Sequence, residues 1–205
     1  MKVNRIISYI DGFNLYFGLK DNNWKKYYWL DIYKLTENLL ISNQQVERVK
    51  YFTARINGPA DKARRQSIYL DALGTIANLD IICGHYLSNV TECKYCGQKH
   101  LDSKEKMTDV NIAVEMIADA LDDKYDVAFL ITADSDLVPA IKLIKKIYPQ
   151  KRIVVCFPPK RHSSSLSQIA DFSLSIFENR FSNSLLPDPI ILKNGYQLRK
   201  PVEWQ

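Results

Sequence analysis

The stretch Val127-Ala128-Phe129-Leu130-Ile131-Thr132, followed by Ala133-Asp134-Ser135-Asp136, decides the fold class of this chain. Six consecutive apolar or β-branched residues are typical of a strand that is buried on both faces of a sheet. A helical pattern over residues 135–147 follows directly. A buried strand that runs into a helix is the first half of a right-handed βαβ unit.

The same alternation extends outward from this unit in both directions. Further strands are predicted at residues 5–10, 49–54, 79–83, 152–157 and 172–176, and helices at 31–40, 60–77, 108–121 and 164–170. Repeated strand–helix units indicate a mostly parallel sheet that is covered by helices on both faces. We therefore expect an open three-layer α/β fold.

Two segments depart from the alternation. Residues 85–107 are polar and show neither the helical nor the strand periodicity of apolar residues. They are expected to form a loop or a small insertion at about residues 85–106. Residues 182–205 contain three prolines and end in Val202-Glu203-Trp204-Gln205. They are expected to form an extended tail that packs on the domain or on a partner. The remaining chain, residues 1–181, is expected to be one domain.

The composition excludes several classes of protein. Of 205 residues, 46% are hydrophobic and 25% are charged, which is typical of a globular chain and excludes wholesale disorder. No apolar run approaches the ~20 residues of a membrane span, and the N-terminus has no signal-peptide pattern. Four cysteines without an export signal are expected to be thiols or metal ligands in a cytoplasmic protein. The net charge of +5 permits a polyanionic partner.

Acidic residues directly follow two of the predicted strands. Asp11 comes after the first strand, and Asp134 and Asp136 come after the strand at 127–132. In an open parallel sheet, ligands bind at the carboxyl ends of the strands, so these acids are expected at one rim. Carboxylates crowded in a half-buried crevice repel each other, and a cation would neutralise them. Oxygen ligands of this kind suit Mg²⁺ or Mn²⁺.

Asp109 is the further candidate acid. A helical projection of residues 108–121 predicts a buried arc and places Asp109 on its side. An unpaired buried charge is costly, so Asp109 is expected to join the rim. The predicted buried arc consists of Val110, Ala113, Val114, Met116, Ile117, Ala120 and Leu121, and the predicted wet arc of Asn111, Glu115, Asp119 and Asp122.

Each acid also has a purely structural interpretation. Asp11-Gly12 is a common turn pair. Thr108 can be a helix N-cap with Asp109 in the first turn, where the helix dipole favours a negative charge. Asp134 or Ser135 can cap the helix that follows. Only their joint placement favours a metal site.

Three segments together resemble the motifs of the NYN domain family, PIN-like nucleases that include the LabA-like group. They are Ile10-Asp11-Gly12-Phe13-Asn14-Leu15, Glu105-Lys106-Met107-Thr108-Asp109-Val110-Asn111 and Leu130-Ile131-Thr132-Ala133-Asp134-Ser135-Asp136-Leu137. The resemblance covers roughly residues 1 to 180. It implies a PIN-like α/β/α fold and metal-dependent cleavage of RNA phosphodiesters. By position it makes Asp11, Asp109, Asp134 and Asp136 the catalytic, metal-holding acids, with Asn14 and Ser135 in support.

The predicted insertion contains candidate zinc ligands. Cys93 and Cys96 are spaced to reach one ion, and His85 and His100 flank them. Tetrahedral Zn²⁺ needs four such ligands, so the predicted structural site is His85, Cys93, Cys96 and His100, with Cys83 as substitute. The alternative is a reduced loop with free thiols. Cys156 lies in an apolar strand and is expected in the core.

Basic and aromatic residues are candidates for contacts with a nucleic acid. Lys160-Arg161 follows a predicted strand, so Arg161, Ser163 and Ser164 could bind phosphate at the rim. Tyr16-Phe17 and Tyr27-Tyr28-Trp29 could stack on unpaired bases, or could be core residues.

These features favour a divalent-metal-dependent endoribonuclease that acts on single-stranded RNA by direct attack of water. One alternative is a non-cleaving RNA-binding adaptor that keeps the acidic pocket. A weaker alternative is a phosphatase of small phosphoesters, because Asp134-Ser135-Asp136 also resembles an aspartyl-phosphate motif. A homo-oligomer or a recruiting protein partner is compatible with each of these functions.

Overall fold

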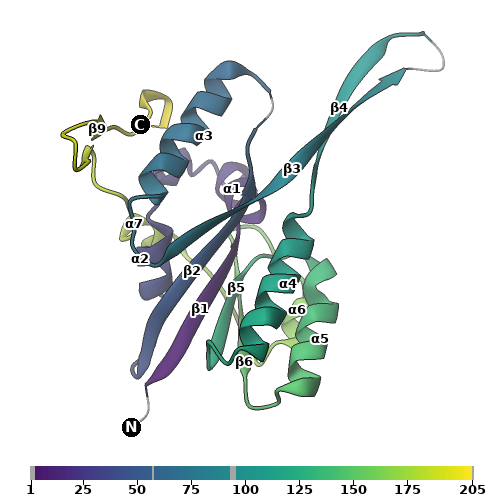
Figure 1. The fold of residues 1–205 in the computed structure, drawn as a ribbon, viewed down its shortest axis with the longest axis vertical. Helices are drawn as coiled ribbons and strands as arrows, with labels where there is room; N and C mark the ends of the chain where they lie inside the picture. The colour runs from purple at the N-terminus through teal and green to yellow at the C-terminus, as the bar shows by residue number, and fades with distance from the viewer. Residues whose placement is uncertain (1–2, 57, 93–95, 205) are drawn as a thin grey trace.

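The computed structural model describes residues 3–56, 58–92 and 96–204, with backbone alone for 86–92 and 99–105. In this part of the chain, seven strands form one sheet in the order β4-β3-β2-β1-β5-β6-β7 (Figure 1). Neighbouring strands are parallel except for the antiparallel pair β3–β4. The strands are β1 Asn4–Asp11, β2 Gln44–Ala54, β3 Leu79–Glu92, β4 Lys99–Lys106, β5 Val127–Ile131, β6 Arg152–Phe157 and β7 Phe172–Ser175.

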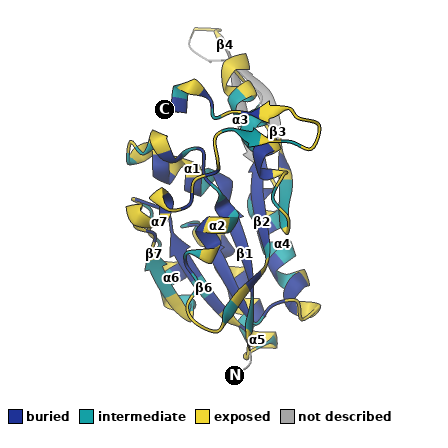
Figure 2. Cartoon of the chain, turned by 90° about the vertical axis from the view of Figure 1, so that its left-hand side faces the viewer, coloured by how far each residue is buried: buried dark blue, intermediate teal, exposed yellow. Residues whose placement is uncertain are grey.

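Helices cover both faces of the sheet, which confirms the predicted α/β fold (Figure 1). One face carries α1 Gly12–Asp21, η1 Lys25–Tyr27, α2 Ile32–Glu37 and α3 Ala60–Leu73. The other carries α4 Thr108–Leu121, η2 Ser135–Leu137, α5 Val138–Ile147 and α6 Ser164–Ile169. Each face has its own apolar core, and Figure 2 shows the buried strands between them. Cys156 is buried, as expected.

The strand order creates a switch point beside β1. The chain runs from β1 through β2 to β3 on one side, and β5 returns to pair with the other side of β1. In open α/β sheets the crevice at the carboxyl ends of strands at such a reversal is where ligands bind. The chain leaves β1 at Asp11 and leaves β5 at Thr132, so both segments lie at this crevice.

The segment predicted as a loop is instead a β-hairpin. β3 continues to Glu92 and pairs with β4 from His85↔Lys106 to Glu92↔Lys99. The two strands extend away from the body of the sheet (Figure 1). Hairpin pairing uses backbone hydrogen bonds, so this segment forms strands without the apolar alternation on which the prediction relied.

Helix α1 was not predicted from the sequence. Gly12 and Gly18 lower its intrinsic helix propensity, and Asp11-Gly12 resembles a turn. The helix forms because Asp11 caps its N-terminus and because Leu15 and Leu19 are buried against the sheet.

The buried arc predicted for α4 is correct for Met116 and Ala120 and wrong for three other members. Val110, Val114 and Leu121 are 61%, 57% and 68% exposed, whereas Ile112 and Asp119 are buried. The helix is therefore rotated so that its buried face combines apolar residues with a carboxylate. Its N-cap is Met107 and not Thr108, since Met107 has the left-handed φ of 80° and Thr108 is already helical.

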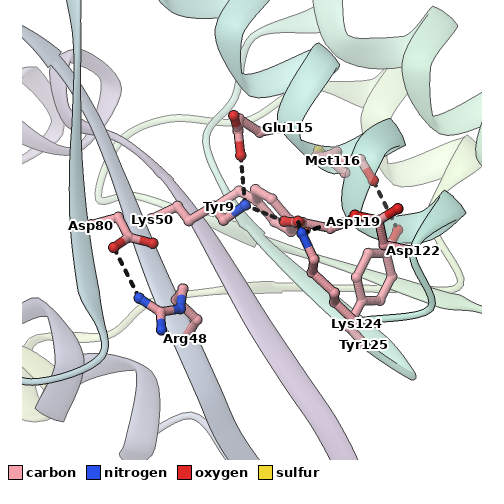
Figure 3. A network of polar contacts seen from close by, with 10 residues as sticks. All are labelled: Tyr9, Arg48, Lys50, Asp80, Glu115, Met116, Asp119, Asp122, Lys124 and Tyr125. Carbon is pink, nitrogen blue, oxygen red and sulfur yellow. Dashed lines mark hydrogen bonds and ion pairs between the residues drawn. The ribbon is translucent and has the colours of Figure 1, made fainter.

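Asp119 belongs to a buried polar network, which Figure 3 shows between α4 and the sheet. The Tyr9 hydroxyl donates to its Oδ2 over 2.8 Å, the buried Lys50 ammonium pairs with the same oxygen, and Lys124 reaches Oδ1 over 3.2 Å. Lys50 also binds Glu115 over 2.6 Å. Because Tyr9 lies on β1 and Lys50 on β2, the network fixes α4 across two strands.

The C-terminal segment packs on the domain as an arm. After α7 Glu178–Ser182, Leu185 forms a bridge with Leu30, and the Trp29 Nε1–H donates to the Pro187 carbonyl over 3.0 Å. β8 Ile190–Ile191 and β9 Gln197–Leu198 pair, and η3 Val202–Trp204 ends the arm. Trp204 is 9% exposed. Within the described residues, no helix is both long and apolar enough to span a bilayer.

Candidate active site

Asp11 is a buried carboxylate at the carboxyl end of β1, 2% exposed. Its Oδ1 accepts hydrogen bonds from the backbone N–H groups of Phe13 and Asn14, each over 3.0 Å. Its Oδ2 accepts from the Asn14 amide over 2.6 Å and from the Thr132 hydroxyl over 2.8 Å. Four donors occupy the lone-pair positions of this carboxylate. Asp11 therefore caps α1 and also ties it to the end of β5.

Thr132 joins Asp11 to Asp134. Its hydroxyl donates to Asp11 and accepts the backbone N–H of Asp134 over 3.1 Å. Burial raises the pKa of the Asp11 carboxyl, hydrogen bonds from Asn14 and Thr132 lower it, and the charge of Asp134 raises it; the net pKa is above 3.8. The two carboxylates are thus close enough to repel each other. Sequence reasoning missed Thr132, although a hydroxyl residue at the end of β5 was a usable signal.

Asp134 and Asp136 form the turn that leads into α5. The Asp134 Oδ1 accepts the backbone N–H of Asp136 over 2.9 Å and caps η2. Asp134 is half-buried, and Asp136 and Ser135 are exposed. Among the described groups, neither the second Asp134 oxygen nor the Asp136 carboxylate accepts a hydrogen bond. The turn therefore presents carboxylate oxygens that are available to a ligand.

Asp109 lies half-buried in the first turn of α4. α4 contacts both β1 and η2, so its N-terminal turn belongs to the same side of the sheet as Asp134. A carboxylate at a helix N-terminus is stabilised by the helix dipole.

The described residues contain no group of three or more His, Cys, Asp or Glu side chains that could hold a metal ion by themselves. Mg²⁺ differs from a caged metal, because it keeps several waters and is held by one or two carboxylates and substrate phosphates. The open oxygens of Asp134 and Asp136 fit such a hydrated ion. Asp11 fits it less directly, since all of its lone pairs accept protein hydrogen bonds.

Arg161 lies away from these acids. Its guanidinium pairs with Asp21 at the C-terminal end of α1, while Asp11 precedes the same helix. A helix of 10 residues is roughly 15 Å long, so the described pairing keeps Arg161 about that far from Asp11. Ser163 caps α6 by accepting the Leu166 N–H over 3.4 Å, and Ser164 is exposed in the first turn.

The predicted zinc set cannot surround one ion as proposed. Cys93 lies outside the described residues. In the hairpin, His100 pairs with Thr91, six residues beyond His85. At about 3.3 Å per residue that interval spans roughly 20 Å, which is too far for two ligands whose bonds to Zn²⁺ are about 2.0 Å. The substitute Cys83 lies still farther along β3 from His100.

A cavity of about 530 Å³ lies on the other side of Asp11, between α1, α3 and η3, the C-terminal turn that contains Glu203 and Trp204. Tyr16 and Phe17 stand at its exposed edge, and Tyr28 is half-buried in its wall. Tyr27 and Trp29 are buried instead, so that part of the predicted stacking set belongs to the core.

Comparison with known proteins identifies the family. The NYN domain family matches residues 5–177, and this chain belongs to it. Membership confirms the resemblance found in the three motifs and supports a nuclease-like function. The match ends before the C-terminal arm.

Two further proteins are similar to this chain. One is the 6-hydroxy-3-succinoylpyridine 3-monooxygenase HspA of Pseudomonas putida (strain DSM 28022 / S16), which is 27% identical over 192 residues. That alignment covers 77% of this chain and 60% of HspA, so the chain spans less than two thirds of this relative's length. The other is a crystal structure of a protein of unknown function from Vibrio parahaemolyticus, with a TM-score of 0.59 and 21% identity. The superposition covers 89% of this chain and 96% of the Vibrio parahaemolyticus chain, which establishes a shared fold.

Proposed function

We propose that this protein is a metal-dependent endoribonuclease that hydrolyses phosphodiester bonds of single-stranded RNA at the crevice between β1 and β5. The observation that carries the proposal is that Thr132 joins Asp11 to Asp134 at the switch point of the sheet, since its hydroxyl donates to Asp11 and accepts the backbone N–H of Asp134. Such a pair costs free energy unless a cation or a protonated state relieves it. Membership of the NYN domain family supports a nuclease over other uses of this crevice.

In this proposal Asp134 and Asp136 hold Mg²⁺ or Mn²⁺ through their open oxygens, with Asp109 adding charge from the start of α4. The ion would lower the pKa of a bound water and neutralise the phosphate oxygens. Asp11 accepts a hydrogen bond from Thr132 and caps α1, and so holds the start of α1 next to the segment that leads to Asp134. Asn14 in turn fixes the Asp11 carboxylate. The role of Asp11 would therefore be to position the crevice and to add negative charge to it.

The test is cleavage of an end-labelled single-stranded RNA in Mg²⁺ or Mn²⁺. We expect Asp134→Asn and Asp136→Asn to lower the rate by at least the roughly 10–100-fold that loss of a group supporting a metal ligand costs. Asn at position 134 keeps the oxygen that accepts the Asp136 N–H, so the turn should remain intact. The matched control is Asp71→Asn, which changes an exposed acid on α3.

The outcomes separate the alternatives. RNA binding without cleavage by the parent protein would support an adaptor. Release of phosphate from small esters alone would support a phosphatase. Equal cleavage by the parent and by both rim variants would contradict the proposed site.

One observation favours a second candidate function. The relative HspA is named as a monooxygenase of a pyridine, and the aromatic cavity beside Asp11 has the size of a small-molecule site, for which about 300–1,000 Å³ is usual. A protein acting on a small aromatic molecule would use this cavity in place of the rim acids. Titration with pyridine carboxylates, followed by tryptophan fluorescence, tests this candidate.

A further inference from the structure

We propose that the cavity between α1, α3 and the C-terminal turn is a subsite for an unpaired nucleobase beside the phosphate at the rim. The inference rests on the proposed function for the identity of the ligand, an RNA strand. Its structural support is independent, because it comes from the opposite face of the sheet and from the C-terminal arm.

The cavity shares its edge with the candidate active site. Gly12 and Phe13, which line it, directly follow Asp11. Thr53, also in the lining, follows Phe52, the register partner of Asp11 on β2. A strand with one phosphate at the rim therefore has its neighbouring base within reach of the cavity.

The lining suits a planar ring. Tyr16 and Tyr28 are in contact at the exposed edge, with ring centroids 5.1 Å apart. Deeper in the wall, Trp204 meets Tyr28 at 5.7 Å and Tyr69 at 6.1 Å, both edge to face. Aromatic side chains stack on bases without requiring a particular sequence, because every base has a π-face.

The charges at the cavity suit a nucleotide more than a neutral ring. Lys25 and Lys62 both line it, and neither has a carboxylate partner anywhere in the described chain. By contrast, Arg65 is already engaged by Asp61 over 2.9 Å and by Glu203 over 3.1 Å. The two lysines are thus the cations available to a phosphate group.

Glu203 adds a hydrogen-bond acceptor. Its Oε1 accepts from Arg64 and Arg65, whereas its Oε2 is buried and has no hydrogen-bond partner among the described groups. An unpaired buried acceptor costs free energy, which a donor on the ligand would recover. The exocyclic amine of adenine is such a donor, and the carbonyl at the same position of hypoxanthine is not.

Two walls of the cavity have different origins. Gly12, Tyr28 and Thr53 belong to the region that matches the NYN domain family, which ends at residue 177. Glu203 and Trp204 come from the C-terminal arm, which lies beyond that match and returns beside α3 (Figure 1). The arm therefore supplies the part of the subsite that lies outside the family match.

The experiment is a titration of the full chain with adenosine 5′-monophosphate in metal-free buffer, followed by the indole N–H resonances of the three tryptophans. We expect the Trp204 resonance to shift and that of Trp24, which is absent from the cavity lining, to stay in place. Ribose 5-phosphate, which lacks a base, should leave both unchanged. Inosine 5′-monophosphate should bind several-fold more weakly than the adenosine nucleotide.

Two variants make the test specific. Tyr16→Ser removes a ring that is 43% exposed and should weaken nucleotide binding about tenfold. Tyr196→Ser removes an exposed ring outside the cavity and should leave the affinity unchanged. The proposal is overturned if ribose 5-phosphate shifts Trp204 as much as the nucleotide does, or if a pyridine carboxylate binds more tightly. Because no metal or cleavage is involved, such a failure is distinct from failure of the proposed nuclease activity.

Discussion

The positions of Asp11 and Asp134 could be predicted from the sequence, but the contacts that join them could not. Both positions follow buried strands, and the geometry of parallel sheets alone predicts that they meet at one rim. Their connection through Thr132 depends on the register of β1 with β5, which pairs Ile10 with Ile131. Register is a tertiary property, so the sequence shows a hydroxyl residue at the end of β5 but does not show that it donates to Asp11, nor the full set of donors on that carboxylate.

Asp134→Asn should stabilise the metal-free fold although it lowers the rate of cleavage. The change removes the charge that raises the pKa of Asp11 and retains the oxygen that caps η2. We expect the free energy of unfolding to rise by about 1 kcal/mol or less, which is roughly 2–4 °C in Tm for a chain of this size. Thermal unfolding followed by circular dichroism measures it. A lower Tm than that of the parent protein would mean that Asp134 serves the fold and not a ligand.

Gly12 is required by close packing beside Asp11. A Cβ at this position would lie 2.7 Å from the Phe52 carbonyl oxygen and 2.7 Å from the Tyr51 ring. We expect Gly12→Ala to lower the free energy of unfolding by about 1–3 kcal/mol, because backbone and ring must shift. Gly74→Ala is the control, since its Cβ would meet only ordinary contacts at 3.4 Å. Urea unfolding of both variants decides the matter, and equal stability would contradict the clash.

At the level of elements, α4 shows why the sequence predicted a helix correctly and its orientation incorrectly. The predicted bounds 108–121 agree with the structure. Two arcs of this helix are similarly apolar, and the one that contains Val110 and Val114 faces solvent. The choice between them comes from Tyr9 and Lys50 on the sheet, whose polar groups require a buried acceptor. Partners on other strands are not visible in the periodicity of one helix.

Asp119→Asn should destabilise the protein in a pH-dependent way. Burial alone would raise the pKa of Asp119, but hydrogen bonds from Lys50, Tyr9 and Lys124 outweigh it and hold the pKa below 3.8. A lowered pKa in the folded state means that the stabilisation is complete above the unfolded-state pKa and is lost as the pH falls through the folded value. At pH 7 we expect a loss of about 3 kcal/mol, because the buried Lys50 ammonium loses the Asp119 carboxylate and keeps only its ion pair with Glu115.

Denaturant unfolding at pH 7 and at pH 3 tests this expectation. The difference in the free energy of unfolding between the parent protein and Asp119→Asn should be smaller at pH 3 than at pH 7. Asp122→Asn is the control, because Asp122 pairs with the same Lys124 at the surface and should change stability by less than about 1 kcal/mol. A difference that does not depend on pH would assign the loss to packing and not to charge.

At the level of the whole molecule, the sheet and its layers could be predicted because each buried strand has a local apolar signal. The hairpin β3–β4 and the C-terminal arm could not. The hairpin has a polar sequence, and its strands are paired from His85↔Lys106 to Glu92↔Lys99. The C-terminal arm has no periodicity, and isolated contacts set its position. Leu185 forms a bridge with Leu30, and Trp204 packs on Tyr28 and on Tyr69 of α3.

The arm should contribute to global stability through its last turn. Trp204 is 9% exposed and packs on Tyr28, Trp29 and Tyr69, so Trp204→Ala leaves a void in the larger apolar core. Buried Trp→Ala changes typically cost about 3–5 kcal/mol, and a position at the edge of the core belongs at the lower end of that range. Tyr196→Ala, in the exposed turn of the same arm, should change stability by less than about 0.5 kcal/mol. If urea unfolding gives the two variants the same midpoint, the arm does not share the cooperative unit of the domain, and the cavity wall that Trp204 forms is not a fixed part of the molecule.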